Sequence, residues 1–139
     1  MASIHQEISI DASPEYIWAA VADVGAVHTR LAPGFVVDTQ LEPGVRIVTF
    51  ANGLVARELI VAIDHDRRRL VWAIVGGRLT HHNASLQVFA EDAGRSRVLW
   101  IADLLPDELA PNIGAMIVQG LRVMQQTLEH SVAQAILSR

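Results

Sequence analysis

One acidic residue interrupts an otherwise apolar stretch of this chain. Glu58 lies within Val55–Ile63, a run rich in Val, Ile and Leu that is typical of a strand, and Leu70–Val75 is a second such run. The charged segment between them, Asp64–Arg69, is typical of an exposed turn, so the two runs predict a hairpin. Glu58 then lies deep in this hairpin, where a carboxylate must either face solvent or line a cavity that uses it.

His82 is a second titratable residue that such a cavity could use. We expect Glu58 and His82 on one face of the sheet, two strands and therefore roughly 10 Å apart. Apolar surroundings would raise the pKa of the carboxyl and lower that of the imidazole, which tunes both groups for acid–base work near neutral pH. The pair predicts proton exchange with, or contacts to, a polar group of an apolar ligand. For Glu58 the alternatives are contact with water or an ion pair with Arg46 or Arg78.

Other kinds of site find little support in the sequence. His81 and His82 are neighbours in a predicted strand, so their side chains point to opposite faces and cannot hold one ion. No further ligand stands at metal-binding spacing, and we expect no metal. The chain shows no Ser/His/Asp triad, phosphate loop or dinucleotide fingerprint, and we expect no cofactor.

The composition narrows the function classes. The 139 residues suffice for one domain with a sizeable core, and we expect a single domain over residues 1–139. A net charge of −4 without a basic stripe argues against a nucleic-acid partner. The chain has no cysteine and residues 1–10 show no signal-peptide pattern, so a cytoplasmic protein is expected. The apolar runs have the length of strands, which predicts no membrane span.

The hydrophobic content is high in relation to the aromatic content. Hydrophobic residues make up 51% of the chain and aromatic residues only 5%. This excess of aliphatic side chains predicts a shielded cavity, a subunit interface, or both.

Periodicity and turn residues predict one strand, two short helices, six strands and a long helix. Ser13 and Pro14 favour a helix start, and Asn52-Gly53 favours a tight hairpin turn. The expected ranges are strands at 4–10, 35–41, 45–50, 55–63, 70–75, 79–89 and 97–105, and helices at 14–24, at 26–31 and from 111 onward.

In this order of elements the chain resembles the helix-grip superfamily. That superfamily includes the lipid-transfer START domains, bacterial polyketide cyclase/dehydrase-like (SRPBCC) proteins, the birch-pollen allergen and the plant abscisic-acid receptors. The resemblance covers roughly residues 3–133. It rests on Ser13-Pro14-Glu15 with Trp18, on Glu58, Asp64 and Gly76-Gly77, on the strands 84–88 and 98–102, and on the closing helix.

The resemblance implies an α+β fold in which a seven-stranded antiparallel sheet curls around the C-terminal helix and encloses a ligand cavity. The positions similar to the family's cavity lining are Val37, Ala56, Glu58, Ile60, Trp72, Ile74, His82, Ala84, Asn112, Met116 and Gly120. Trp100 joins them if its face of the strand points inward, which we favour over the equally apolar face of Leu99 and Ile101. Two features depart from the family: His82 replaces a tyrosine, and the tight turn at Ala51–Gly53 replaces the gating loop of the hormone receptors.

The hairpin register decides what the other face of the sheet shows. We expect Ile60 opposite Ile74 and Ala62 opposite Trp72, which directs Glu58 inward. Seven aliphatic residues then point outward, and an antiparallel sheet with such a face predicts a covering partner, most simply a homodimer. A register shifted by one residue would instead bury this face and expose Glu58. The seven residues are Val55, Leu59, Val61, Ile63, Val71, Ala73 and Val75.

Three functions follow from these expectations. The first is binding or transport of a small hydrophobic ligand such as a lipid, polyketide or aromatic compound, anchored by Glu58 and His82. The second is a cofactor-independent polyketide cyclase or dehydratase in which Glu58 and His82 transfer protons. The third is an interaction or stress-related module that acts through the outer face of the sheet. The ligand itself cannot be named, because an apolar cavity specifies size and shape rather than identity.

Overall fold

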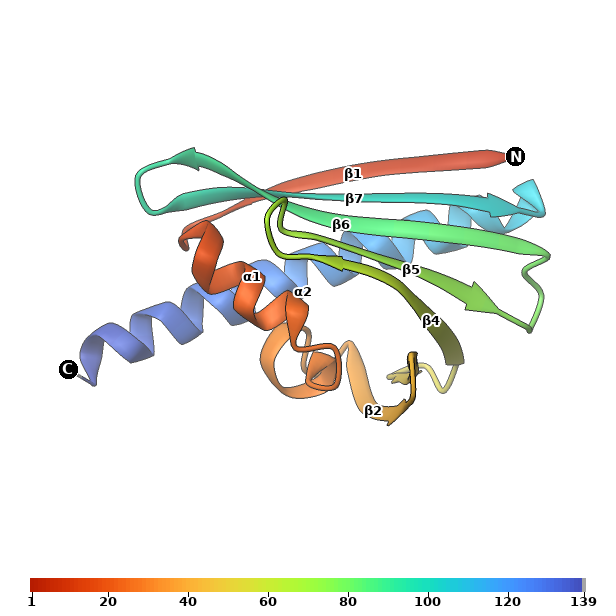
Figure 1. Ribbon diagram of the computed structural model, residues 1–139, viewed down its shortest axis with the longest axis horizontal. Helices are drawn as coiled ribbons and strands as arrows, with labels where there is room; N and C mark the ends of the chain where they lie inside the picture. The colour runs from red at the N-terminus through yellow and green to blue at the C-terminus, as the bar shows by residue number, and fades with distance from the viewer. Residues whose placement is uncertain (139) are drawn as a thin grey trace.

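The computed structural model describes residues 1–138 as a sheet with helices packed against it (Figure 1). The helical elements are α1 (Pro14–Ala22), the π-helical turn η1 (Val27–Leu31), the 3-10 turn η2 (Asp107–Leu109) and the long α2 (Ala110–Leu137). The strands are β1 (Ala2–Ile10), β2 (Val36–Glu42), β3 (Val45–Phe50), β4 (Val55–Asp64), β5 (Arg69–Val75), β6 (His81–Asp92) and β7 (Arg95–Leu105).

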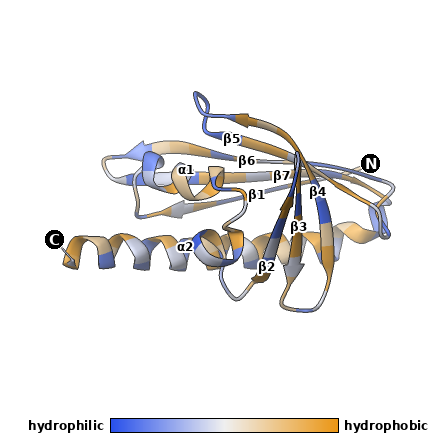
Figure 2. Ribbon diagram, turned by 60° about the horizontal axis from the view of Figure 1, so that its bottom comes forward, coloured by the Kyte–Doolittle hydropathy of each residue, from blue (hydrophilic) through white to orange (hydrophobic). Residues whose placement is uncertain are grey.

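All seven strands form one antiparallel sheet in the order β1-β7-β6-β5-β4-β3-β2. In Figure 2, β1, β7 and β6 run nearly along α2, whereas β2, β3 and β4 cross it, so the sheet bends around the helix. This arrangement confirms the predicted helix-grip fold. None of the helices in residues 1–138 combines the length and the apolar character that crossing a bilayer requires.

The first helix begins where its capping residues predict. The hydroxyl of Ser13 accepts a hydrogen bond from the backbone N–H of Tyr16 at 3.2 Å, and Pro14 occupies the first turn. The helix buries Ile17 and Val21 in the core and ends at Ala22, two residues before the predicted end.

The register of the central hairpin differs from the prediction. Glu58 lies opposite Ile74, and Ile60 lies opposite Trp72. A β-bulge between Ile60 and Ala62 adds one residue to β4. Both predicted pairs, Ile60 with Ile74 and Ala62 with Trp72, are therefore wrong, because the two strands are displaced by two residues from the predicted register. Beyond the bulge Ala62 takes an outward position opposite Val71. Glu58 keeps its predicted face because a displacement of two residues preserves the alternation of side chains and because Glu58 precedes the bulge.

The inner face of β7 is the one that carries Trp100. Val98, Ala102 and Leu104 lie on the same face of the strand as Trp100 and are buried. Its ring packs edge-on against Trp72 with 5.6 Å between ring centroids, which joins β7 to β5 across the concave side of the sheet.

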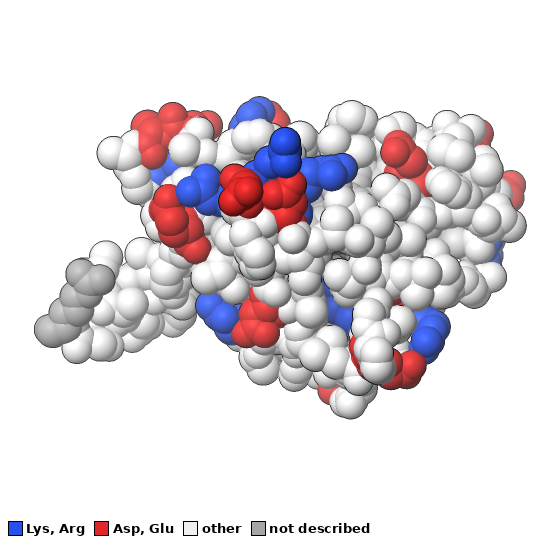
Figure 3. Space-filling view, in the orientation of Figure 1, with Lys and Arg blue, Asp and Glu red and all other residues white. Residues whose placement is uncertain are grey.

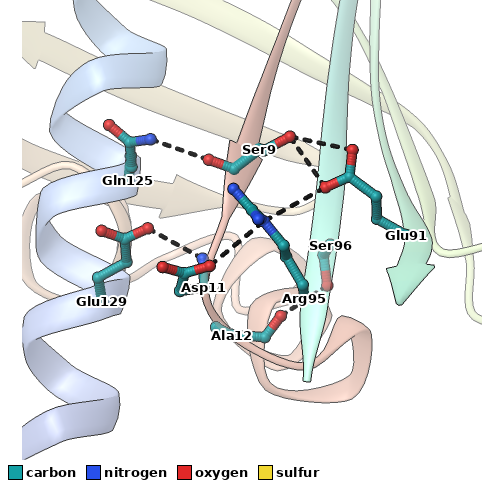
Figure 4. A network of polar contacts seen from close by, with 8 residues as sticks. All are labelled: Ser9, Asp11, Ala12, Glu91, Arg95, Ser96, Gln125 and Glu129. Carbon is teal, nitrogen blue, oxygen red and sulfur yellow. Dashed lines mark hydrogen bonds and ion pairs between the residues drawn. The ribbon is translucent and has the colours of Figure 1, made fainter. Parts of the chain in front are cut away.

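Polar contacts fasten the end of the sheet that lies opposite the N-terminus of β1. Gln125 on α2 donates to the backbone oxygen of Ser9 at 2.9 Å, and Glu129 accepts from the backbone N–H of Asp11 at 2.9 Å (Figure 4). Arg95 on β7 lies 3.3 Å from Asp11 and 3.5 Å from Glu91. These contacts hold α2 against the end of β1, and Arg95 links the residue after β1 to β6. None of these residues lines the cavity described below.

Charged side chains gather on one part of the surface. Figure 3 shows them over the β4–β5 turn and α1, while much of the remaining face is uncharged. Arg68 lies 2.9 Å from Glu15, and Arg67 lies 3.0 Å from Asp64. The predicted solvent-exposed character of this turn is confirmed.

The two glycines of α2 offer a matched test of packing. A Cβ at Gly120 would lie 3.1 Å from Phe35 and 3.2 Å from Trp100, whereas a Cβ at Gly114 would meet only Ile4, at 3.9 Å. We expect Gly114→Ala to raise the free energy of unfolding by about 0.5–1 kcal/mol through helix propensity. Gly120→Val should lower it by about 1–3 kcal/mol through overpacking.

Chemical denaturation of both variants measures these changes, with Gly120→Ala as the intermediate case. A Gly120→Val variant as stable as the wild type would show that α2 does not lie this close to Phe35 and Trp100.

Candidate functional site

A cavity of about 360 Å³ lies between the concave side of the sheet and α2. Its walls are mainly apolar and come from η1, β2 to β7, the β5–β6 loop and α2. The larger apolar side chains in the wall are Phe35, Trp72, Ile74, Trp100, Met116 and Met124. A concave apolar chamber with few polar groups is the usual form of a small-molecule site.

The mouth of the cavity is marked by lining residues that are also exposed. Leu54 comes from the β3–β4 turn and Val55 from the start of β4, and 75–78 come from the end of β5 and the loop after it. Asn112 at the beginning of α2 is a further exposed lining residue. A molecule could therefore enter between the two hairpin ends and the first turns of α2.

Three polar side chains form a row across the inner face of the sheet. Arg46 on β3 pairs in register with Glu58 on β4, and Glu58 pairs with Ile74 on β5. His82 on β6 lies beside Ile74 and bonds to its backbone. Arg46, Glu58 and His82 are all buried and all line the cavity.

Glu58 and Arg46 form a buried ion pair. Nε of Arg46 donates to Oε1 of Glu58 at 2.7 Å, and the two side chains are only 6% and 7% exposed. The guanidinium also lies over the ring of Trp72, 5.6 Å from the ring centroid. Of the alternatives that the sequence left open, the structure shows the pair with Arg46, whereas Arg78 lies exposed at the cavity mouth.

Burial and pairing act on the Glu58 carboxyl in opposite directions. Removal from water raises its pKa above the usual value, while the charge and the hydrogen bond of Arg46 lower it, and burial is the larger effect. The carboxyl is therefore a stronger proton acceptor than an exposed glutamate.

His82 takes the place of a backbone acceptor in the sheet. The regular pairing of β5 with β6 ends at Trp72 opposite Ala84. Two residues further along β5, the N–H of Ile74 donates to Nδ1 of His82 at 3.0 Å. Burial lowers the pKa of His82 to about 4, with a smaller lowering by His81 and an opposing effect of Asp103. The imidazole is therefore neutral at physiological pH.

Eight of the twelve residues expected in the lining do contact the cavity. The structure brings together Ala56, Glu58, Trp72, Ile74, His82, Trp100, Asn112 and Met116.

The other four lie elsewhere, each for a local reason. Val37 is 53% exposed, because a bulge between Val36 and Asp38 directs Val36 inward in its place. Ile60 and Ala84 flank Trp72 on neighbouring strands and pack in the core. Gly120 faces the rings of Phe35 and Trp100, which leave it no access to the cavity.

The sequence analysis gave Arg46 no site role of its own. Its only signal was the alternation in β3, where Arg46 shares one face with Val48 and Phe50, both of which line the cavity. Within residues 1–138 no three His, Asp or Glu side chains gather as a metal site would need.

The sequence of residues 1–135 matches the family described as polyketide cyclase / dehydrase and lipid transport. The chain belongs to this family. None of the curated proteins matches the sequence.

Solved structures with the same fold come from several organisms. A protein of Thermobifida fusca is 26% identical, with 94% of this chain and 95% of that chain covered and a TM-score of 0.77. Norcoclaurine synthase of Thalictrum flavum, in complex with dopamine and hydroxybenzaldehyde, is 19% identical (96% and 87% covered, TM-score 0.73). A START superfamily protein of Mycobacterium smegmatis is 14% identical (96% and 98% covered, TM-score 0.72). The last two likenesses concern the fold alone.

The buried ion pair of Arg46 and Glu58 leads to a prediction about the stability of the protein. Arg46→Met leaves the buried Glu58 carboxylate without its counter-charge, so the free energy of unfolding at neutral pH should fall by about 3 kcal/mol. The pKa of Glu58 then rises further above its unfolded value, and the folded chain binds the proton more tightly than the unfolded chain. The loss should therefore be smallest at acidic pH and grow as the pH rises.

Urea denaturation of the variant at several pH values measures this effect. The control is Arg46→Met/Glu58→Leu, which removes both charges and should recover most of the stability. A loss that is the same at all pH values would indicate that Glu58 is not the group left uncompensated.

Proposed function

We propose that this protein binds a small, largely apolar molecule in the cavity between its sheet and α2, and that the row of Arg46, Glu58 and His82 holds the polar group of that molecule. The observation that carries the proposal is the position of this row. Its three side chains are buried, yet each belongs to the wall of an otherwise apolar cavity.

The cost of burying these groups supports a role in binding. Taking an arginine and a glutamate out of water costs several kcal/mol for each ion, and their attraction often only balances this cost. Apolar residues of similar size would build the same wall with equal or better stability. Polar groups at this position are therefore better explained by a ligand than by the fold.

The size of the cavity sets the size of the ligand. A volume of about 360 Å³ falls at the lower end of the range for small-molecule sites. This favours a molecule of two or three fused rings, or a short acyl chain, over a large lipid.

Binding can be tested with a neutral fluorescent hydrocarbon-like probe, N-phenyl-1-naphthylamine. Its emission should rise on binding, and Trp72 and Trp100 in the cavity wall should be quenched. Met116→Trp fills the cavity and should weaken binding at least tenfold. The matched control, Leu59→Trp, adds the same ring to the outer face and should leave binding unchanged.

If both tryptophan variants lose probe affinity to the same extent, or if both bind the probe as tightly as the wild type, the cavity is not the binding site. Circular dichroism of both variants shows whether the fold is retained.

A second function is favoured by the family and by the two titratable groups in the wall. A cofactor-independent polyketide cyclase or dehydratase needs a group that accepts a proton beside a carbonyl substrate. Glu58, with its raised pKa, is suited to that part. Turnover of a poly-carbonyl substrate that is lost in Glu58→Gln, with binding retained, would favour this function over binding alone.

The outer face of the sheet supports a proposal about assembly. Leu59 and Val61 are exposed there by 38% and 58%. Val55 and Val75, which also border the cavity mouth, are exposed by 63% and 41%. Val71, also expected on this face, is buried in the middle of the sheet. We propose a homodimer that covers the exposed residues, in a chain whose lack of cysteine suits the cytoplasm.

Light scattering at high protein concentration tests the dimer. The wild type should have twice the chain mass of 15.2 kDa, and Val61→Glu should have the mass of one chain. Gln6→Glu, which adds the same charge at an exposed position of β1, is the control. A wild type of single-chain mass would leave the outer face as the surface of a monomer.

A further inference from the structure

The hydrogen bond between Ile74 and His82 determines where the imidazole carries its proton. A backbone N–H is always a donor, so the Nδ1 that it approaches at 3.0 Å must be the unprotonated nitrogen. In a neutral ring the hydrogen then lies on Nε2. His82 is therefore fixed in one tautomer by a main-chain group that cannot change its own role.

The Nε2–H of His82 is free to meet a ligand. Within residues 1–138 it makes no hydrogen bond to the protein, and no fully enclosed side-chain nitrogen or oxygen lacks a partner. Nε2 is therefore not sealed within the protein, and His82 is a lining residue of the cavity. The ring thus offers the cavity a hydrogen-bond donor without a charge.

Arg46 and Glu58, the other two residues of the row, determine whether the site favours a charged or a neutral ligand. The positive charge of Arg46 is already met by Glu58 at 2.7 Å, and His82 is neutral. An anionic ligand would have to compete with Glu58 for Arg46 or lie beside a carboxylate in apolar surroundings, which is costly. A neutral ligand with an oxygen acceptor meets the free donor without this cost.

We propose that the cavity selects neutral apolar molecules that carry a carbonyl group, and that the Nε2–H of His82 donates a hydrogen bond to the carbonyl oxygen. This inference rests on the proposed function, because it names the ligand class of the same cavity. A neutral histidine can in general either accept a proton or donate a hydrogen bond. The proposal assigns the Nε2 of His82 the role of hydrogen-bond donor.

The first test concerns the protein without any ligand. Nitrogen-15 NMR of histidine-labelled protein at neutral pH should show, for His82, a pyridine-like Nδ1 and a pyrrole-like Nε2. The signals are assigned by their loss in His82→Gln. A pyridine-like Nε2, or the averaged shifts of a ring that exchanges between tautomers, would overturn the proposal.

The second test uses two probes of nearly the same shape, 2-acetylnaphthalene and 2-isopropenylnaphthalene. The second has a CH₂ group where the first has its carbonyl oxygen. A neutral hydrogen bond should make the ketone bind roughly five- to tenfold more tightly to the wild type. The carbonyl stretch of the bound ketone, observed with a carbon-13 label, should move to lower frequency than in an apolar solvent.

Two variants separate the hydrogen bond from the shape of the site. His82→Leu removes the donor and should abolish both the preference and the frequency change. His82→Gln can accept from Ile74 with its oxygen and donate with its nitrogen, and should retain part of both effects. If His82→Leu does not fold, the wild-type frequency and the nitrogen-15 spectrum still decide the matter.

The outcomes distinguish this inference from the proposed function. Equal binding of the two probes with an unchanged carbonyl stretch would overturn the donor role and leave the proposed function intact. Failure of both naphthalenes and of N-phenyl-1-naphthylamine to bind would overturn the proposed function and this inference with it.

Discussion

The buried pair of Arg46 and Glu58 is the interaction on which the site depends. Two opposite charges lie 2.7 Å apart, almost without contact with solvent, on adjacent strands of one sheet. Each alone would be intolerable at this depth, because an uncompensated ion in apolar surroundings costs more than most single contacts can offset. The pair therefore requires β3 and β4 to hold a fixed register, and it requires the apolar walls around it to remain in place.

The curvature of the sheet makes room for this pair. β1, β7 and β6 run nearly along α2, while β2 to β4 bend away and cross it (Figure 2). Bulges in β2 and β4 add one residue to each strand, and each changes which side chains point inward beyond it. At the other border of the cavity, β5 and β6 separate after Trp72 and Ala84, and the side chain of His82 binds the N–H of Ile74 that the ladder no longer serves. The cavity is thus bordered by the bulge in β2 and by the end of the β5–β6 ladder.

The fold could be predicted from the sequence because its signals are local. Alternating apolar residues, the Ser13-Pro14 helix start and the charged turn at Asp64–Arg69 each act within a few residues. The depth of Glu58 followed from the same logic, since the turn fixes the tip of the hairpin and Glu58 lies far from it. The bulges were not predictable, because an added residue in a strand leaves no mark in an aliphatic run. Val37 and Ala62 were for this reason assigned to the wrong face of the sheet.

Other features of the site depend on contacts between distant segments. Gly120 was expected to line the cavity, yet the space beside it is filled by Phe35 and Trp100, which come from separate parts of the chain. Arg46 and His82 show the same dependence in their chemistry. From the sequence alone, an arginine in a strand with one apolar face is expected at the surface, unless a buried carboxylate is known to lie opposite. A neutral histidine can adopt either tautomer until a neighbouring group selects one. In His82 that neighbour is a backbone N–H, whose position is set by the fold of the whole sheet. The chemical character of the cavity is therefore a property of strand pairing, and substitutions that move β5 relative to β6 will alter it without touching a lining side chain.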